Sequence, residues 1–237
     1  MAQSKIEWTE QTWNPITGCT KYSEGCLHCY AEIFARRLQA MGNKRYINGF
    51  EVTIHEELFN RPLEWKKPKL IFVNSMSDLF HKDVPDDVIL ELFKIMNKAS
   101  QHTFQILTKR SQRLVELNSQ INWTKNIWMG VSVESERVLQ RCEDLKRTDA
   151  KIKFVSAEPL LGSLSNINLN GIDWLIVGGE SGHGSRPMKE EWVLELQQLA
   201  QDNNTAFFFK QWGGFNKKKN GKLLKGEICQ EYPQIND

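Results

Sequence analysis

The sequence predicts an α/β protein in which a parallel βα repeat forms a partial or complete TIM-like barrel. Two observations support this prediction. Short, continuous apolar runs recur along the chain, and each of them ends in a cluster of polar or glycine residues. Patterns with helical periodicity follow several of these runs. Strands that are buried on both faces read as continuous apolar runs, and their alternation with helices is typical of a parallel sheet.

The expected strands are rich in β-branched, aromatic and leucine residues, which favour extended backbone. Each is short enough to be a single strand of a small domain. In chain order, the six runs are Leu70–Val73, Phe104–Leu107, Ile127–Val131, Ile152–Val155, Trp174–Val177 and Ala206–Phe209.

The expected helices are indicated by apolar residues that recur on one face. Asp86–Ala99 shows this periodicity, and it has acidic residues in its first turn and a lysine in its last, which suits the helix dipole. Tyr30–Met41, Ser135–Arg147 and Lys189–Gln201 are expected to be helical as well. The segment between Pro159 and Trp174 is too interrupted by Gly and Asn to predict a helix.

The composition is ordinary for a globular protein. The 237 residues include 31 Lys+Arg and 29 Asp+Glu, which gives a formal net charge of +2. A charge this small does not indicate nucleic-acid binding, so any such function must depend on local basic patches. No apolar stretch approaches the ~18 residues of a transmembrane helix, and the amino terminus MAQSKIEWTE lacks the apolar core of a signal peptide. We therefore expect a cytoplasmic protein without a membrane partner.

Acidic residues at the ends of the expected strands indicate a shared ligand site. In a parallel sheet or barrel, the carboxyl ends of the strands lie at one edge, where the connecting loops bind ligands. Glu134, Glu158 and Glu180 each lie just beyond an apolar run. A carboxylate that is desolvated there needs a partner. The alternatives are unrelated strand ends, or structural ion pairs with a nearby arginine or lysine.

The cysteines are distributed unevenly along the chain. Cys19, Cys26 and Cys29 have the spacing C-x6-C-x2-C, whereas Cys142 and Cys229 stand alone. In a cytoplasmic chain, a group of three thiols favours a metal ion or cluster over disulfides. We expect Cys142 to be a small packing residue and Cys229 to have no role.

Two kinds of metal site suit three clustered thiols. A structural zinc ion usually takes four ligands, and the nearby His28 is poorly placed between Cys26 and Cys29 to be the fourth. An iron–sulfur cluster also normally takes four cysteines, so a cluster with three leaves one iron open for a substrate or cofactor. We favour the open iron–sulfur cluster, with zinc and no metal as the alternatives.

Motifs along the chain extend the cysteine loop to a family resemblance. They are TWNPITGCTKYSEGCLHCYAE, FVNSMSDLFH, FQILTKR, GVSVE, FVSAEPLLG, WLIVGGESG and FFFKQWGG. Together they resemble the radical S-adenosylmethionine (SAM) superfamily and, more closely, a family of phage-associated radical-SAM-like proteins largely of unknown function. The similarity runs from about residue 6 to about residue 214 and implies a barrel of the radical SAM type. Most superfamily members have the spacing C-x3-C-x2-C, so this loop carries an insertion.

The resemblance implies a [4Fe–4S] cluster held by Cys19, Cys26 and Cys29, with SAM bound at the open iron. In such enzymes an electron donor reduces the cluster, and SAM is cleaved to a 5′-deoxyadenosyl radical that abstracts a hydrogen atom from the substrate. With a first strand counted just before Cys19, the ends of the later strands are the candidate SAM contacts. They are Asn74, Ser75, Ser77 and Asp78 for the amino group, Ser132 and Glu134 for the ribose, and Ser156, Glu158, Gly178, Gly179 and Glu180 for the adenine and methionine ends.

Basic residues at the same edge are candidates for substrate binding. Lys109, Arg110 and Lys210 follow expected strands, where they can bind a phosphate or a carboxylate or pair with the acidic residues. Basic residues also gather near aromatic ones at 65–67 and 212–219, as in sites for single strands or flipped bases, although such lysines are often plain solvated surface.

These features predict a radical SAM enzyme that modifies or repairs a nucleic acid or nucleotide. The alternative is a non-catalytic, zinc- or iron–sulfur-bearing module that binds nucleic acid or protein. We expect residues 1–214 to form the barrel domain and residues 215–237 a basic tail or hairpin, since Asn220-Gly221 is a turn signal. A phage-encoded protein of this kind would act in the host cytoplasm.

Overall fold

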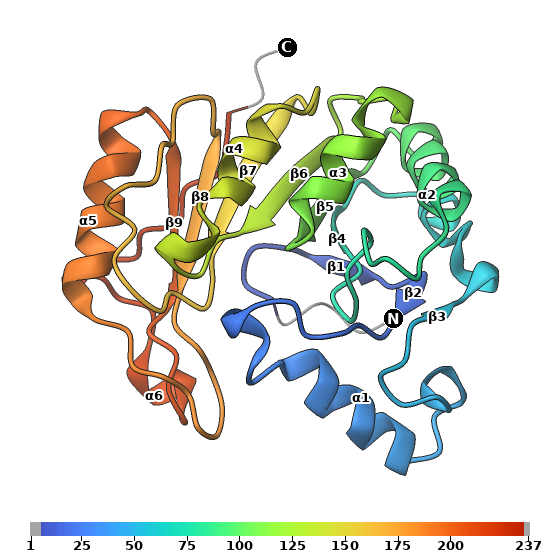
Figure 1. The fold of residues 1–237 in the computed structure, drawn as a ribbon, viewed down its shortest axis with the longest axis horizontal. Helices are drawn as coiled ribbons and strands as arrows, with labels where there is room; N and C mark the ends of the chain where they lie inside the picture. Colours follow the sequence, from blue (N-terminus) through green and yellow to red (C-terminus); the bar gives the residue numbers. More distant parts are fainter. Residues whose placement is uncertain (1–5, 235–237) are drawn as a thin grey trace.

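One curled sheet of seven parallel strands dominates the fold (Figure 1). The structure is a computed structural model that describes residues 6–234, apart from the side chains of Lys217 and Lys218. The sheet forms a half-barrel with β1 and β9 as its two edges. In spatial order the strands are β1 (Gln11–Trp13), β4 (Leu70–Val73), β5 (Thr103–Thr108), β6 (Ile127–Ser132), β7 (Ile152–Ala157), β8 (Trp174–Gly178) and β9 (Ala206–Gln211).

The predicted fold class is therefore confirmed. All six apolar runs are strands, and each lies parallel to its neighbour in the sheet. Spatial order follows chain order along the large sheet, as expected when each crossover returns the chain to the adjacent position. A separate antiparallel pair consists of β2 (Ile16–Thr17) and β3 (Thr53–Ile54).

Helices follow most strands, largely where the sequence predicts them. The α-helices are α1 (Tyr30–Ala40), α2 (Asp86–Lys98), α3 (Ser111–Leu117), α4 (Gln140–Lys146), α5 (Glu190–Asp202) and α6 (Lys217–Asn220). The predicted helix 135–147 is divided into a 3₁₀ turn and α4, and α3 was not predicted. The 3₁₀ helices are η1 (Glu24–Cys26), η2 (Lys44–Tyr46), η3 (Glu56–Leu58), η4 (Arg61–Glu64), η5 (Asn118–Gln120) and η6 (Glu136–Val138).

The two faces of the sheet pack against different partners. Side chains of one face, such as Leu175 and Val177, belong to the large core that includes the helices. Their neighbours Trp174 and Ile176 point to the concave face and join a second, largely aromatic cluster. The ring of Trp174 lies 6.1 Å from that of Trp8, which precedes β1. This cluster fills part of the half-barrel.

The chain after residue 214 returns along β9. Asn220-Gly221 does not turn a hairpin there; Gly221, with φ of 75°, follows the last residue of α6, where a glycine commonly ends a helix. Further on, the backbone of Cys229 accepts a hydrogen bond from Phe209 N, and Glu231 O accepts one from the indole of Trp174 at 2.8 Å. The division of the chain near residue 214 stays a prediction.

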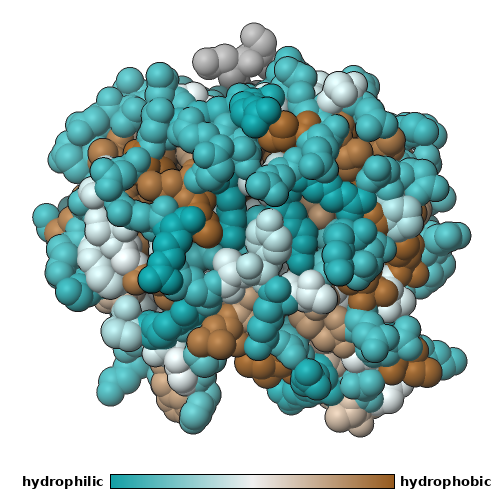
Figure 2. Space-filling view, viewed as in Figure 1, coloured by the Kyte–Doolittle hydropathy of each residue, from teal (hydrophilic) through white to brown (hydrophobic). Residues whose placement is uncertain are grey.

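The face seen in Figure 2 is mostly hydrophilic, with hydrophobic side chains interspersed. Several exposed apolar residues belong to α1 and its flanks: Leu27, Ile33, Phe34 and Met41. Among the described helices, none has the length and apolar character required to span a membrane.

Candidate functional site

A cavity of about 610 Å³ lies at the carboxyl edge of the sheet. Strand ends that are far apart in the sequence line it together, as predicted. Of the residues proposed from the sequence, the lining includes Cys19, Cys26, Cys29, Asn74, Ser75, Ser77, Asp78, Lys109, Arg110, Ser132, Ser156, Glu158, Gly179, Glu180 and Lys210. Glu134 and Gly178 are not among the residues that line it.

At two glycines, the backbone of the cysteine loop passes so close to other parts of the protein that a side chain would not fit. Gly18 has φ of 85°, and a Cβ at this position would lie 2.0 Å from the carbonyl oxygen of Glu51, so only glycine fits. At Gly25, a Cβ would lie 2.9 Å from the carboxyl carbon of Glu134. The two glycines let the loop turn tightly and bring its middle against the end of β6.

All three loop cysteines are free thiols on the wall of one cavity. Their chemistry fits an iron–sulfur cluster, because three thiols from one loop face the same space. Within residues 6–234, no group of three or more His, Cys, Asp and Glu side chains is arranged to hold a metal ion. The convergence of the thiols on a single centre therefore stays a prediction.

The other two cysteines lie away from the cavity lining. Cys142 is buried on α4, where its thiol donates to the carbonyl of Asn168 at 3.4 Å and burial raises its pKa to about 11. Cys229 packs against the core beside Gln197. Cys142 is therefore a small packing residue, as the sequence predicts.

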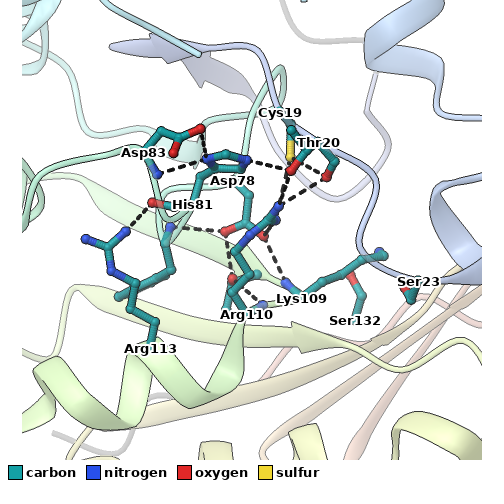
Figure 3. A network of polar contacts seen from close by, with 12 residues as sticks. Cys19, Thr20, Ser23, Asp78, His81, Asp83, Lys109, Arg110, Arg113 and Ser132 are labelled. Atoms are coloured by element: carbon teal, nitrogen blue, oxygen red, sulfur yellow. Dashed lines mark hydrogen bonds and ion pairs between the residues drawn. The ribbon is translucent and has the colours of Figure 1, made fainter. Parts of the chain in front are cut away.

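Arg110 connects the cysteine loop to Asp78 (Figure 3). Its Nη1 donates to Asp78 Oδ2 at 2.9 Å and to Cys19 Sγ at 3.6 Å, while Nη2 donates to the carbonyl of Thr20 at 3.1 Å. Burial, with Asp78 nearby, raises the pKa of Cys19 to about 11, although the Arg110 guanidinium opposes this change. The arginine thus provides the positive charge that favours a thiolate at position 19.

Asp78 has no acceptor site left over for another ligand. Its Oδ1 accepts from Thr108 Oγ1 at 2.7 Å and from Phe80 N, and its Oδ2 accepts from Lys109 N and Arg110. An ionised carboxylate offers about four acceptor sites, and all are used here. Asp78 lines the cavity, yet its contacts indicate that it orients Arg110.

A buried histidine supports the same end of the loop (Figure 3). His81 Nδ1 accepts the backbone N–H of Asp83 at 3.2 Å, so the proton resides on Nε2, which lies 2.8 Å from Thr20 Oγ1. Burial and the charge of Arg110 lower the pKa of His81, which keeps the ring neutral. His81 therefore donates a hydrogen bond to the residue next to Cys19.

Glu134 contacts the cysteine loop. Its fully buried carboxylate accepts from the Ser23 hydroxyl, from Gly25 N at 3.4 Å and from Arg141 Nη1 at 2.8 Å. Burial alone would raise the pKa of Glu134, but Lys109, Arg141 and the Ser23 hydrogen bond together hold it below the usual range. The expected contact with a SAM ribose stays a prediction.

Glu158 and Glu180 also have cation partners. Lys210 Nζ lies 2.7 Å from Glu158 Oε1, the pairing that the sequence offered as an alternative. Arg186 donates to both oxygens of Glu180, at 2.6 and 2.9 Å, and these bonds lower the pKa of Glu180 although burial opposes them. Arg141 and Arg186 were missed by sequence reasoning, since each lies on a loop or helix with no distinguishing pattern.

Two buried polar atoms at the cavity have no hydrogen-bond partner among the described residues: Asn74 Nδ2 and Trp8 Nε1. Asn74 also has φ of 58°, an uncommon backbone conformation that costs energy unless the surroundings impose it. Its Oδ1 is occupied by the backbone N–H of Ile16 at 3.4 Å. The amide therefore keeps a donor that no described residue uses.

Solved structures with a similar fold include those of spore photoproduct lyase. One, in complex with dinucleoside spore photoproduct, matches with a TM-score of 0.51 and 14% identity over 85% of this chain and 64% of the lyase chain. A variant with bound AdoMet and dinucleoside spore photoproduct gives a TM-score of 0.50 at 14% identity, over the same shares. The chain thus spans 64% of the length of the lyase chains it matches. At this identity the likeness shows the fold alone.

Comparisons of the sequence give a family and no individual relative. Residues 3–233 match the family described as "Protein of unknown function (DUF5131)". No curated protein matches the sequence. The expected phage association stays a prediction.

Proposed function

We propose that this chain, which belongs to the DUF5131 family, is a radical SAM enzyme that acts on a nucleic acid or nucleotide. In this proposal Cys19, Cys26 and Cys29 hold a [4Fe–4S] cluster and the cavity binds SAM. The single observation that carries the proposal is the placement of three free thiols of one loop on the wall of a large cavity, at the carboxyl edge of a parallel half-barrel.

When bound, a reduced cluster and SAM would supply a 5′-deoxyadenosyl radical for hydrogen abstraction. The residues of the chain would bind and orient SAM and neutralise negative charge at the cluster. Ser75 and Ser77 donate their hydroxyl protons to Asn14 Oδ1 and to the carbonyl of Ile16, which leaves their oxygen lone pairs for an amino group. The unpaired Asn74 amide suits a carboxylate oxygen, and Arg110 stabilises negative charge at Cys19.

The mouth of the cavity supports a base-containing substrate. Phe215 lines the cavity and is 78% exposed, and its ring lies 6.2 Å from that of His183. Lys109 and Lys210 line the same cavity. Aromatic faces beside cations are typical of proteins that stack unpaired bases and neutralise phosphates. The fold shared with spore photoproduct lyase is consistent with this substrate class.

Anaerobic purification and reconstitution test the proposal. We expect about four irons per chain and broad absorption at about 400 nm, with both lost when Cys19, Cys26 or Cys29 is replaced by alanine. Cys142→Ala and Cys229→Ala are the matched controls and should keep the iron. Incubation with SAM and a chemical reductant should then release 5′-deoxyadenosine.

Two outcomes would contradict the proposal. A colourless protein with one zinc ion would support a non-catalytic, metal-bearing binding module. A cluster-loaded protein that binds an oligonucleotide but leaves SAM intact would show that the cavity does not perform radical chemistry.

A further inference from the structure

The cysteine loop, which is longer than in most radical SAM proteins, carries an aromatic ring beside two arginines. The guanidinium carbon of Arg110 lies 4.9 Å from the centre of the Tyr22 ring, and that of Arg141 lies 5.5 Å from it. Both arginines come from the carboxyl edge of the sheet, Arg110 just after β5 and Arg141 on α4. Arginine favours such stacking because its guanidinium is planar and weakly hydrated.

The residues that follow Tyr22 are also held by side chains that come after strands of the sheet. Ser23 and Gly25 donate to the buried Glu134, which is itself paired with Arg141. Arg186 Nη2 donates to the carbonyl of Glu24 at 3.0 Å. The contacts therefore reach every residue from Tyr22 to Gly25, although their partners lie on three separate segments of the chain.

We propose that Tyr22 is a positioning residue that holds the cysteine loop in place before any metal binds. It does so through its cation–π contacts with Arg110 and Arg141, the second of which is fixed by Glu134. The inference rests on the proposed function, since that function makes this loop the one that provides the cysteine ligands of the cluster. A longer loop has more conformations to lose when its thiols gather around one centre. Contacts that hold residues 22–25 remove part of that cost in advance.

Tyr22 combines a large exposed fraction with contacts to two fixed cations. The residue is 49% exposed, yet its ring touches two cations whose own carboxylate partners are buried. Asp78 fixes Arg110, and Glu134 fixes Arg141, so neither guanidinium is free to follow the ring if the loop moves. A fixed pair of cations is a rigid support, whereas two mobile arginines would not be.

Amide hydrogen exchange in the metal-free protein tests the proposal directly. The N–H groups of Gly25, Cys26 and Leu27 donate to Glu134, Ser23 and Glu24, so they exchange only when the loop opens. Each cation–π contact of an exposed ring contributes a factor of roughly 2–5 to an equilibrium, so Tyr22→Leu should speed this exchange roughly 5–30-fold.

Tyr22→Phe is the matched variant, because it keeps the ring beside the two arginines. We expect its loop to exchange within about 3-fold of the parent rate. Glu134→Gln keeps the shape of the side chain but removes the charge that fixes Arg141, so it should also speed exchange in the loop. Asp144→Asn is the control for a lost buried carboxylate, since Asp144 contacts Ser111, Gln140 and Arg147, which all lie outside the loop. It should lower the melting temperature without a selective change in loop exchange.

Iron loading is the second measurement. Tyr22→Leu should take up iron more slowly and hold it less tightly than Tyr22→Phe does, at equal melting temperatures. Equal loop exchange in Tyr22→Leu and the parent would overturn the inference. A parent protein that binds no iron would instead contradict the proposed function, and the exchange result would still decide whether Tyr22 holds the loop.

Discussion

Replacement of Arg110 by methionine tests whether this side chain stabilises both the fold and the cysteine loop. Methionine keeps a long apolar stem and removes the guanidinium. In the parent, the side chains of Arg110 and Asp78 are each 9% exposed and their charged atoms lie 2.9 Å apart. Loss of one partner of a buried ion pair costs about 3–5 kcal/mol, because the remaining charge is left uncompensated.

The expected cost is smaller at this site. Asp78 keeps the hydrogen bonds from Thr108, Phe80 N and Lys109 N after the substitution, so its charge stays partly satisfied. We therefore expect a loss of about 2–3 kcal/mol in the free energy of unfolding. For a chain of this length, that corresponds to a fall of about 4–12 °C in melting temperature.

Urea unfolding followed by tryptophan fluorescence measures this loss. A double-mutant cycle with Asp78→Asn isolates the coupling between the two side chains, which should exceed about 1 kcal/mol. Arg110→Met should also reduce iron incorporation at 25 °C, where the variant remains folded. A free energy of unfolding within about 0.5 kcal/mol of the parent value, with no coupling to Asp78, would refute the reasoning.

Three further predictions concern the other side chains at the cavity. The pKa of Glu180 lies below its ordinary value of 4.5, so its pair with Arg186 stabilises the fold above about pH 4.5, and this stabilisation is lost as the pH falls through the folded-state pKa. The melting temperature of Glu180→Gln should therefore lie below that of the parent at neutral pH and approach it in acid, and a difference that stays constant with pH would contradict this. Glu158→Gln leaves Lys210 without its charge partner and should lower the free energy of unfolding by about 1–2 kcal/mol in urea titrations; an unchanged free energy would show that the pair does not stabilise the fold. Phe215→Ala should weaken binding of a single-stranded oligonucleotide about 5–100-fold and leave the melting temperature within about 1 °C, because its ring is 78% exposed; unchanged binding would exclude it as a stacking surface.

The strands could be predicted because burial on both faces leaves a strong pattern. The five residues of β8, Trp174–Gly178, are all buried, and no polar side chain interrupts them. Helix α3 could not be predicted with the same ease, because its seven residues give fewer than two periods of the helical repeat. The gathering of strand ends around one cavity follows from the parallel topology, which explains why most candidate residues line it.

The partners of the acidic residues could not be predicted. Glu134 has the position expected of a ligand-binding residue, directly past the end of β6, yet its contacts reach Ser23 and Gly25, which lie more than one hundred positions earlier in the chain. Spacing along the sequence carries no information about which loop will return to that point. The pairing of Glu180 with Arg186, six positions later, depends on the path of the loop between them.

These pairings change which side chains are available to a ligand. A desolvated carboxylate at the edge of a parallel sheet needs a cation, and here Asp78, Glu134, Glu158 and Glu180 each have one within the protein. A ligand that approaches this edge therefore meets neutralised acids, which act as supports for arginine and lysine. Unused hydrogen-bonding capacity remains instead on Asn74 Nδ2 and on the serine oxygens. The most conspicuous acidic residues of the sequence thus hold cations in place, while the less conspicuous Asn74 and the serines keep hydrogen-bonding capacity that the protein itself does not use.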